Sequence, residues 1–226
     1  MANERITSLD EQLRISNENR ASFLERFQSL SPETVQSIDF AYDIAKESHR
    51  TNKRDTGERY FEHPRQVALI LIDELHILDP DMTMALLFHD TGEDTPIFGN
   101  ITKNYYQWKE TAEFRISKVS NPQVAKYVVG LTKPCVDNVN FSSKQEVYDF
   151  YIEGLKNSNP ETILLKMCDR LHNLRSLAGV TKEKQIRTCT ETLEIYFPIF
   201  DLIKDKYPKE HDYLVEQMQQ EINKYN

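Results

Sequence analysis

Glycine is scarce in this chain, with only six glycines among 226 residues. Regular alternation of polar and apolar residues, the pattern of a strand, is also rare, whereas apolar residues recur often at helical spacing. No segment is rich enough in glycine, proline or serine to indicate a flexible linker. The sequence therefore predicts an all-α fold, and one domain over residues 1–226 is the simplest division.

Cysteines and long apolar runs are few as well. The three cysteines are odd in number and have no paired spacing, which argues against a disulfide framework or a zinc ribbon; they are Cys135, Cys168 and Cys189. We interpret them as buried or half-buried thiols in a reducing compartment. No apolar run approaches the roughly 20 residues of a membrane span, and the first residues lack the apolar core of a signal peptide. We expect a cytoplasmic protein without a membrane partner.

Positive charge is in deficit, since the formal net charge is −8 at pH 7. A protein that wraps nucleic acid needs a basic face for the phosphates, so nucleic acid is not an expected partner. A local basic pocket for a small phosphorylated ligand is compatible with this charge.

Helix start signals are frequent. A capping side chain followed by proline marks four of the expected starts, at Ser31-Pro32, Asp79-Pro80, Asn121-Pro122 and Asn159-Pro160. Together with the apolar spacing these signals predict helices over about 32–49, 64–75, 82–88, 122–131, 143–156, 160–175, 181–207 and 209–225. Residues 4–29 have a looser helical pattern, residues 101–120 are mixed, and Pro198 is expected to kink the helix that contains it.

The stretch from Leu86 to Thr95 places more side chains that can bind a metal or transfer a proton in one turn than any other part of the sequence. An apolar run stops at His89-Asp90, and Glu93 and Asp94 follow. An imidazole beside a carboxylate supplies half of a coordination shell for a divalent cation, and two further carboxylates could handle a bound water. The alternative interpretation is a helix end followed by a solvated acidic loop.

A second polar group lies in the apolar pattern of the helix around Asp169. Polar groups among buried apolar residues are costly unless they are paired or bind something. One interpretation is an ion pair of Asp169 with Arg170 or Arg175; the other is a metal ligand. His63 precedes Pro64 near a helix start, where a histidine is more often a cap or a surface residue. Combined, two imidazoles and two carboxylates suit one divalent metal with positions open for water and substrate: His63, His89, Asp90 and Asp169.

Four blocks of sequence resemble the HD-domain hydrolases of the alarmone (p)ppGpp. These enzymes are the hydrolase halves of the long Rel/SpoT proteins and the stand-alone small alarmone hydrolases. The blocks cover roughly residues 38–180 and stand in the family's order: Arg54-Asp55-Thr56-Gly57-Glu58 with Tyr60 and His63-Pro64; His89-Asp90-Thr91-Gly92-Glu93-Asp94-Thr95; Leu131-Thr132-Lys133; and Lys166-Met167-Cys168-Asp169-Arg170-Leu171-His172-Asn173-Leu174.

The resemblance implies an HD-type helical bundle, with a motif-bearing core over about 31–180 and C-terminal helices over 181–226. It implies one Mn²⁺ per chain at His63, His89, Asp90 and Asp169, a catalytic pair at Glu93 and Asp94, and nucleotide contacts at Lys53, Arg54 and Asn173. The reaction it implies is hydrolysis of the 3′-pyrophosphate of (p)ppGpp, which releases GDP or GTP and pyrophosphate. Ligand type alone does not select Mn²⁺, because zinc often binds such sites more tightly.

The chain departs from the family's pattern at three places without losing a proposed ligand. Arg59 stands where related chains commonly have proline, Gly92 where they often have an aliphatic residue, and Met167-Cys168 where Leu-Ala is usual. Arg59 and Gly92 leave the exact substrate open. No synthetase-like segment follows, so the chain looks like a stand-alone hydrolase, with a homo-oligomer left open. The alternatives are an HD-type phosphohydrolase of an adenine alarmone (pppApp or ppApp), a nucleoside monophosphate or NADPH, and a non-catalytic alarmone-binding module.

Overall fold

The computed structural model describes residues 18–54, 57, 59–135 and 139–225. Helices dominate this part of the chain, and its only β contact is an isolated bridge between Lys53 and Arg59. The predicted all-α fold is confirmed. The helices are α2 (Arg20–Glu25), α3 (Pro32–Ser48), α4 (Glu62–Leu69), α5 (Pro80–Phe88), α6 (Thr91–Asp94), α7 (Tyr105–Val119), α8 (Pro122–Leu131), α9 (Lys144–Lys156), α10 (Pro160–Arg175), α11 (Lys182–Glu191), α12 (Phe197–Phe200) and α13 (Pro208–Ile222).

The four predicted helix starts are confirmed. In α3, α5, α8 and α10 the capping side chain accepts a hydrogen bond from a backbone amide of the first turn, and proline occupies the start of the helix; the caps are Ser31, Asp79, Asn121 and Asn159. The cap satisfies an amide that has no partner within the helix, and proline has no N–H to satisfy at that position. Local chemistry therefore decides where these helices begin.

Three segments differ from the expected helices. The pattern over 4–29 yields only the short helix α2, and residues 4–17 lie outside the described residues. The mixed segment 101–120 contains a regular helix, α7, which Asn104 caps. The predicted helix over 181–207 is interrupted by a π-helical turn at Thr192–Tyr196, just before Pro198. Proline cannot donate a hydrogen bond to the preceding turn, which explains why the helix widens there.

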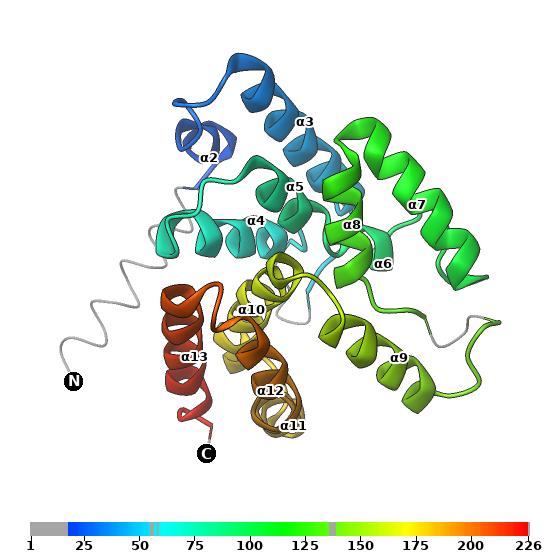
Figure 1. Cartoon of the computed structure of the whole chain (residues 1–226), viewed down its shortest axis with the longest axis vertical. Coiled ribbons are helices and arrows are strands. Elements are labelled where there is room, and N and C mark those ends of the chain that lie inside the picture. The colour runs from blue at the N-terminus through cyan, green and yellow to red at the C-terminus, as the bar shows by residue number, and fades with distance from the viewer. Residues whose placement is uncertain (1–17, 55–56, 58, 136–138, 226) are drawn as a thin grey trace.

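Helix α10 lies in the middle of the molecule, between the group of α3, α4, α5 and α8 and the C-terminal helices (Figure 1). It contacts α4, α5, α8, α9, α12 and α13. Helix α5 is buried on all sides, because every residue from Met82 to Phe88 is at most 3% exposed. The end of α5 and the middle of α10 therefore meet inside the hydrophobic core, and both carry polar residues of interest.

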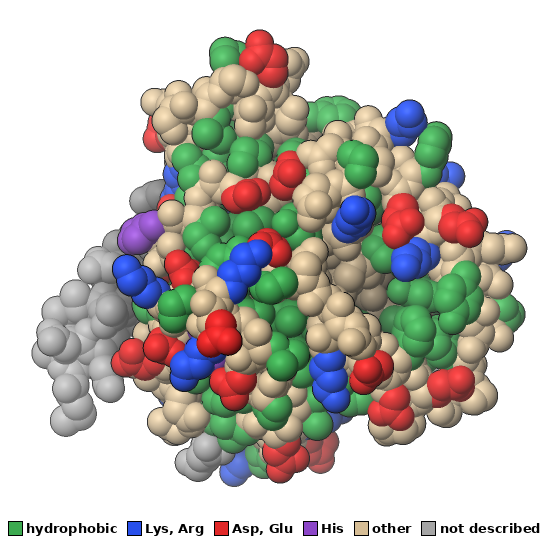
Figure 2. All heavy atoms as spheres, viewed as in Figure 1, with side chains coloured by type: hydrophobic (Ala, Val, Ile, Leu, Met, Phe, Trp, Pro, Cys, Tyr) green, Lys and Arg blue, Asp and Glu red, His purple; other side chains and the backbone are tan. Residues whose placement is uncertain are grey.

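The surface agrees with the acidic composition. Figure 2 shows Lys and Arg side chains interspersed with Asp and Glu on the visible face, so the residues drawn there in colour form no continuous basic stripe. None of the helices in the described part of the chain has the length and apolar character that a bilayer span requires. Cys168 and Cys189 are buried and Cys135 is half-buried, as expected.

Candidate metal centre and pocket

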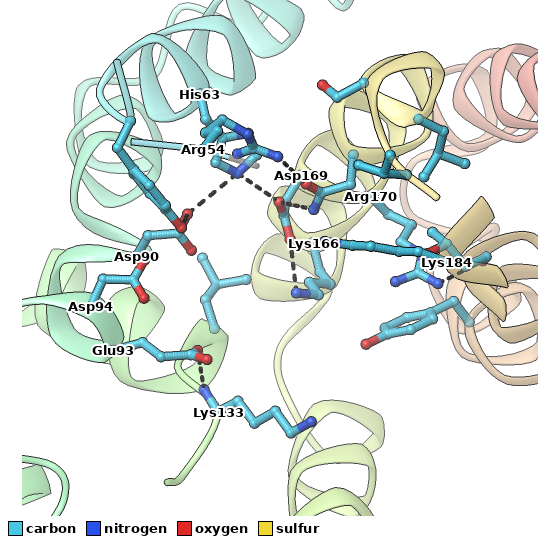
Figure 3. Close-up of a pocket in the computed structure, with 18 of the residues that line it drawn as sticks. Arg54, His63, Asp90, Glu93, Asp94, Lys133, Lys166, Asp169, Arg170 and Lys184 are labelled. Atoms are coloured by element: carbon cyan, nitrogen blue, oxygen red, sulfur yellow. Dashed lines mark hydrogen bonds and ion pairs between the residues drawn. The ribbon is translucent and has the colours of Figure 1, made fainter. Parts of the chain in front are cut away.

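Two imidazoles and two carboxylates from three helical segments converge at one point. Figure 3 labels three of these residues, His63, Asp90 and Asp169. His63 comes from α4, His89 and Asp90 follow α5, and Asp169 comes from α10. The Nε2 atoms of the two histidines are 3.2 Å apart. Asp169 Oδ1 lies 3.2 Å from His63 Nε2 and 3.6 Å from His89 Nε2, and the two Asp90 oxygens lie 3.4 and 3.2 Å from the same nitrogens. The structure thus brings together all four predicted ligands.

Hydrogen bonds on the far sides of both rings orient the Nε2 atoms toward this point. His89 Nδ1 lies 2.7 Å from the carbonyl oxygen of Leu86, so Nδ1 carries the proton and Nε2 presents its lone pair to the cluster. His63 Nδ1 lies 2.8 Å from Nδ1 of His172, and one of these rings donates to the other. Burial lowers the pKa of both His63 and His172, which favours neutral rings. His63 is 2% exposed, so the cap or surface interpretation of this residue is wrong.

The negative charge of the two carboxylates in this cluster must be offset by a positive charge. Burial alone would lower the pKa of His89, but Asp90 and Asp169 outweigh burial and raise that pKa to about 9. Two buried carboxylates next to two lone-pair nitrogens need either a proton or a metal cation to offset their charge. Two nitrogen and two oxygen donors fit a divalent transition metal, and they do not choose among manganese, iron and zinc. His63, His89 and Asp90 alone already place one donor atom each within 4.8 Å of one another.

The side chain of Asp169 is held from two sides. Asn173 Nδ2 donates to Oδ1 over 2.7 Å, and Lys166 Nζ donates to Oδ2 over 2.8 Å. Asp169 is 3% exposed, and the nearby Lys166 ammonium holds the pKa of this carboxyl well below its usual range despite burial. One oxygen therefore faces the histidines while the other is fixed by the lysine.

The predicted alternative for Asp169, an ion pair with Arg170 or Arg175, is wrong. Arg170 pairs with Glu191 over 2.7 Å, and Arg175 pairs with Glu74 over 2.6 Å. Both arginines leave α10 on faces other than the one that carries Asp169.

Glu93 and Asp94 lie on the short helix α6, not in a loop. A Cβ added at Gly92, the second residue of α6, would lie 2.9 Å from the Cζ2 atom of Trp108. Only glycine therefore lets α6 pack this closely against α7. This contact explains the departure of Gly92 from the family pattern. The stretch is a helix rather than the loop of the alternative interpretation, and the side chains of Glu93 and Asp94 are exposed to the solvent of the pocket.

The two carboxylates of α6 share an environment that disfavours charge. Desolvation by the pocket walls and the charges of Asp90 and Asp94 raise the pKa of Glu93 to about 7, while Glu93 accepts a hydrogen bond from the backbone amide of Lys133 over 3.3 Å. Desolvation and Asp90 also raise the pKa of Asp94, partly offset by the Tyr60 hydroxyl. That hydroxyl donates to Asp90 Oδ2 over 3.0 Å.

These groups line a pocket of about 420 Å³. The carboxylates gather at one end, and Figure 3 shows cationic side chains on the other sides. Its lining contains the cations Lys53, Arg54, Lys133, Lys166, Arg170 and Lys184. The three predicted nucleotide contacts all line it, and Arg54 Nη2 donates to Asn173 Oδ1 over 3.0 Å. An acidic chain thus forms a local basic pocket, as the charge analysis allows.

Several supporting residues were not predicted. Lys166, His172 and Tyr60 stand inside the motif blocks, and each contacts one of the proposed ligands. The spacing offers a partial signal, because Lys166 and His172 each lie three residues from Asp169 and so share its helix face. The contact of His172 with His63 needs the tertiary structure, because 109 residues separate them.

The fold and the site together define a helical bundle with a histidine–aspartate metal centre between its helices. The HD domain family model matches residues 41–200, and the chain belongs to this family.

Two curated bacterial proteins illustrate the similarity. A protein of Aquifex aeolicus named guanosine-3′,5′-bis(diphosphate) 3′-pyrophosphohydrolase is 37% identical over 177 residues, which cover 78% of this chain and 23% of that protein. A protein of Brucella melitensis named GTP pyrophosphokinase rsh is 33% identical over 180 residues, which cover 78% of this chain and 22% of that protein. The chain therefore spans less than a quarter of the length of these relatives.

A solved structure shares the fold. It is described as that of a metazoan ortholog of SpoT that hydrolyzes ppGpp and plays a role in starvation responses. The match covers 84% of this chain and 96% of the solved one, with a TM-score of 0.62 and 24% identity. At this identity the likeness concerns the fold alone.

Proposed function

We propose that this chain hydrolyses the 3′-pyrophosphate of (p)ppGpp in the cytoplasm, with one Mn²⁺, and releases GDP or GTP and pyrophosphate. The observation that carries the proposal is the four-ligand cluster beside a carboxylate pair, at the end of a pocket with six cationic side chains in its lining. The names of the bacterial relatives support the same substrate. We propose a small-molecule nucleotide as the substrate.

His63, His89, Asp90 and Asp169 would hold the cation, which supplies the Lewis acidity that activates water and polarises a phosphoryl oxygen. Other side chains of the protein hold these ligands in position. Asn173 and Lys166 keep Asp169 in place, and the bonds on the far side of each imidazole keep its Nε2 atom directed inward.

Glu93 and Asp94 handle the protons. In the reaction a bond forms between the water oxygen and the phosphorus next to the ribose, and the bond from that phosphorus to the 3′-oxygen breaks. The attacking water loses a proton and the 3′-oxygen gains one. A carboxylate whose pKa is about 7, as for Glu93, can both take and return a proton near neutral pH. Asp94, beside it, lies close to Asp90 and Tyr60 and orients the water.

The cations of the pocket neutralise the phosphates of the substrate. Lys53, Arg54 and Asn173 lie on one side of the pocket, and Lys133 lies on the side of Glu93. Charge-assisted hydrogen bonds from lysine and arginine are the strongest that a phosphate accepts. A substrate with diphosphates at both ribose positions would therefore find donors at both ends of the pocket.

A metal-supplemented hydrolysis assay with product identification tests the proposal. The protein is incubated with Mn²⁺ and, in parallel, ppGpp, pppGpp, ppApp, NADPH and a nucleoside monophosphate. We expect pyrophosphate with GDP or GTP from the guanine alarmones. Release of orthophosphate, or faster turnover of NADPH or of an adenine alarmone, would overturn the assignment of substrate.

The same assay with Asp90→Ala separates catalysis from simple binding. We expect the variant to lose hydrolysis together with its effect on cellular alarmone levels. An unchanged cellular effect without hydrolysis would favour an alarmone-binding module instead.

A further inference from the structure

A second cavity, of about 270 Å³, lies behind the metal centre. It is lined by residues of α2, α3, α4 and the segments just before α2 and α4. We call it the rear cavity. The proposed reaction uses none of the side chains in its lining, and Arg59, the unexplained departure from the family pattern, is among them.

Two buried polar side chains of the rear cavity have nitrogens without hydrogen-bond partners among the described residues. His49 is 1% exposed, and neither of its ring nitrogens has a hydrogen-bond partner among the described residues. Arg65 is 5% exposed, and its Nε–H has no partner within that same part of the chain. Buried groups of this kind are normally paired, and an unpaired one costs free energy. Since both side chains line the rear cavity, a ligand in the cavity would supply what they lack.

Within the described part of the chain, the free hydrogen-bonding groups of the rear cavity are the Nε–H of Arg65 and the two ring nitrogens of His49, of which one donates and one accepts while the ring is neutral. Glu62 accepts from Arg59 over 3.1 Å and also from the Nη2 atom of Arg65. The other two carboxylates of the lining, Glu18 and Glu47, pair with Arg26 and Arg50.

Lys46 completes the donor set. It also lines the rear cavity, and no hydrogen bond or ion pair joins it to a described residue. The exposed ammonium of Lys46, the buried Nε–H of Arg65 and an N–H of His49 are available as donors, and the lining carries five cationic side chains against three carboxylates. A ligand that complements this set is rich in acceptors and negatively charged.

The volume restricts the size of that ligand. The rear cavity is smaller than the pocket of the metal centre, with about 270 Å³ against about 420 Å³. We therefore assign to it a ligand smaller than the nucleotide substrate.

The rear cavity communicates with the metal centre through two stacked rings. His49 stacks on Tyr60 with ring centroids 4.7 Å apart and planes 17° apart. The hydroxyl of Tyr60 donates to the metal ligand Asp90. A ligand that binds His49 and shifts its ring therefore acts on Tyr60, and through Tyr60 on Asp90.

We propose that the rear cavity is a binding site for a small diphosphate anion, with Lys46, His49 and Arg65 as donors, and that its occupation acts on Asp90 through Tyr60. Binding does not depend on the proposed reaction. The regulatory consequence, inhibition by the pyrophosphate that hydrolysis releases, rests on the proposed function.

Calorimetric titration of inorganic pyrophosphate into the metal-free full chain tests binding. Lys46→Ala and His49→Phe remove donors from the rear cavity, and the phenyl ring keeps the stacking on Tyr60. We expect each to weaken binding at least tenfold. Lys209→Ala removes an exposed lysine of α13 and serves as the control with the same charge change; it should bind like the wild type. Helix content by circular dichroism confirms that each variant is folded.

Pyrophosphate could also bind to the cationic side chains in the pocket of the metal centre. The titration is therefore repeated with Lys133→Ala, which removes one of them. Binding that disappears in Lys133→Ala and persists in Lys46→Ala would place pyrophosphate in that pocket and overturn the proposal. Absence of binding to the wild type at millimolar concentration would also overturn it.

Steady-state kinetics test the coupling. We expect pyrophosphate to lower kcat for alarmone hydrolysis in the wild type, and His49→Phe to relieve this inhibition at least fivefold. Purely competitive inhibition that His49→Phe leaves unchanged would refute the coupling. A chain that binds pyrophosphate in the rear cavity yet hydrolyses no alarmone would refute the proposed function and leave the binding site standing.

Discussion

His63 and His89 present their Nε2 atoms to each other at 3.2 Å, with two carboxylates beside them. Such an arrangement of lone pairs and negative charges is unfavourable on its own and becomes favourable once a cation lies between them. At the scale of single residues, the centre is thus specified by four side chains and by the hydrogen bonds that orient them.

Asp90→Ala tests the ligand assignment. We expect the variant to bind Mn²⁺ at least tenfold more weakly, because one oxygen donor and one charge are lost. Metal content after dialysis, measured by inductively coupled plasma mass spectrometry, checks this. Asp205→Ala, at an exposed aspartate, is the control. Full metal occupancy in Asp90→Ala would remove Asp90 from the ligand set.

Glu93→Ala and Asp94→Ala test the division of roles. Because neither residue is among the four proposed ligands, whose donor atoms meet at the two Nε2 atoms, we expect both variants to keep their metal and to lose turnover by about 10²–10⁴-fold, the usual contribution of a general acid or base. Metal content and kcat are measured on the same preparations. Loss of metal from either variant would contradict this division.

Gly92→Ala tests the contact between α6 and Trp108. The new methyl group would lie 2.9 Å from the indole, so we expect a loss of about 1–3 kcal/mol in the free energy of unfolding. Gly154→Ala is the matched control. Its Cβ would meet no atom within 4 Å, and alanine in a helix is favoured by about 0.5–1 kcal/mol, so this variant should be slightly stabilised. Urea denaturation of both variants measures the two changes in the free energy of unfolding. Equal changes in Gly92→Ala and Gly154→Ala would contradict the proposed contact with Trp108.

At the scale of elements, α10 serves two purposes. One face carries Lys166, Asp169 and Asn173 toward the metal centre. From another face Arg170 reaches the C-terminal helices, where its Nε–H donates to Thr192 over 2.8 Å and its guanidinium lies over the ring of Tyr196. The helix therefore links the metal centre to the pocket wall built by α11 and the π-helical turn.

Arg170→Met should loosen this wall. Arg170 is 7% exposed and its partner Glu191 is only partly buried, so we expect a loss of about 2–4 kcal/mol in the free energy of unfolding, below the usual cost of breaking a fully buried pair. KM should rise more than kcat falls, because the wall carries Lys184 and the metal ligands stay in place. Arg170→Lys keeps the charge and should recover part of the stability. A change in kcat alone would argue against this role.

At the scale of the whole molecule, burial of His49 makes stability depend on pH. Burial lowers the pKa of His49 to about 4 in the folded chain, below the value of 6.5 for an exposed histidine. As the pH falls, His49 therefore takes up its proton at a higher pH in the unfolded chain than in the folded chain. The stability that the neutral ring contributes is therefore present above pH 6.5 and is lost progressively between pH 6.5 and 4.

His49→Phe should remove this dependence. Relative to the variant, the metal-free wild type should lose about 3 kcal/mol of stability between pH 7 and 4, since each pKa unit corresponds to about 1.4 kcal/mol. Urea denaturation of both proteins across this range provides the comparison. Parallel pH profiles would show that His49 titrates normally in the folded chain.

Much of the local structure could be predicted from the sequence. The pairs Ser31-Pro32 and Asn159-Pro160 begin helices because the cap and the proline act within one turn. The four ligands were chosen from residue type and family resemblance, and the structure brings them together. Their roles, and the division into a single domain, stay predictions. The short helix at Glu93 was missed, because the packing of Gly92 against Trp108 decides it.

The sequence by itself determined the helices, their caps and the residue types available for a metal centre, because these depend on interactions within a few residues. The tertiary structure decided the rest. It placed His172 against His63, which lies 109 residues earlier. It also left His49 and Arg65 facing the rear cavity. Such contacts join distant parts of the chain, and they are set by how whole helices pack around α10.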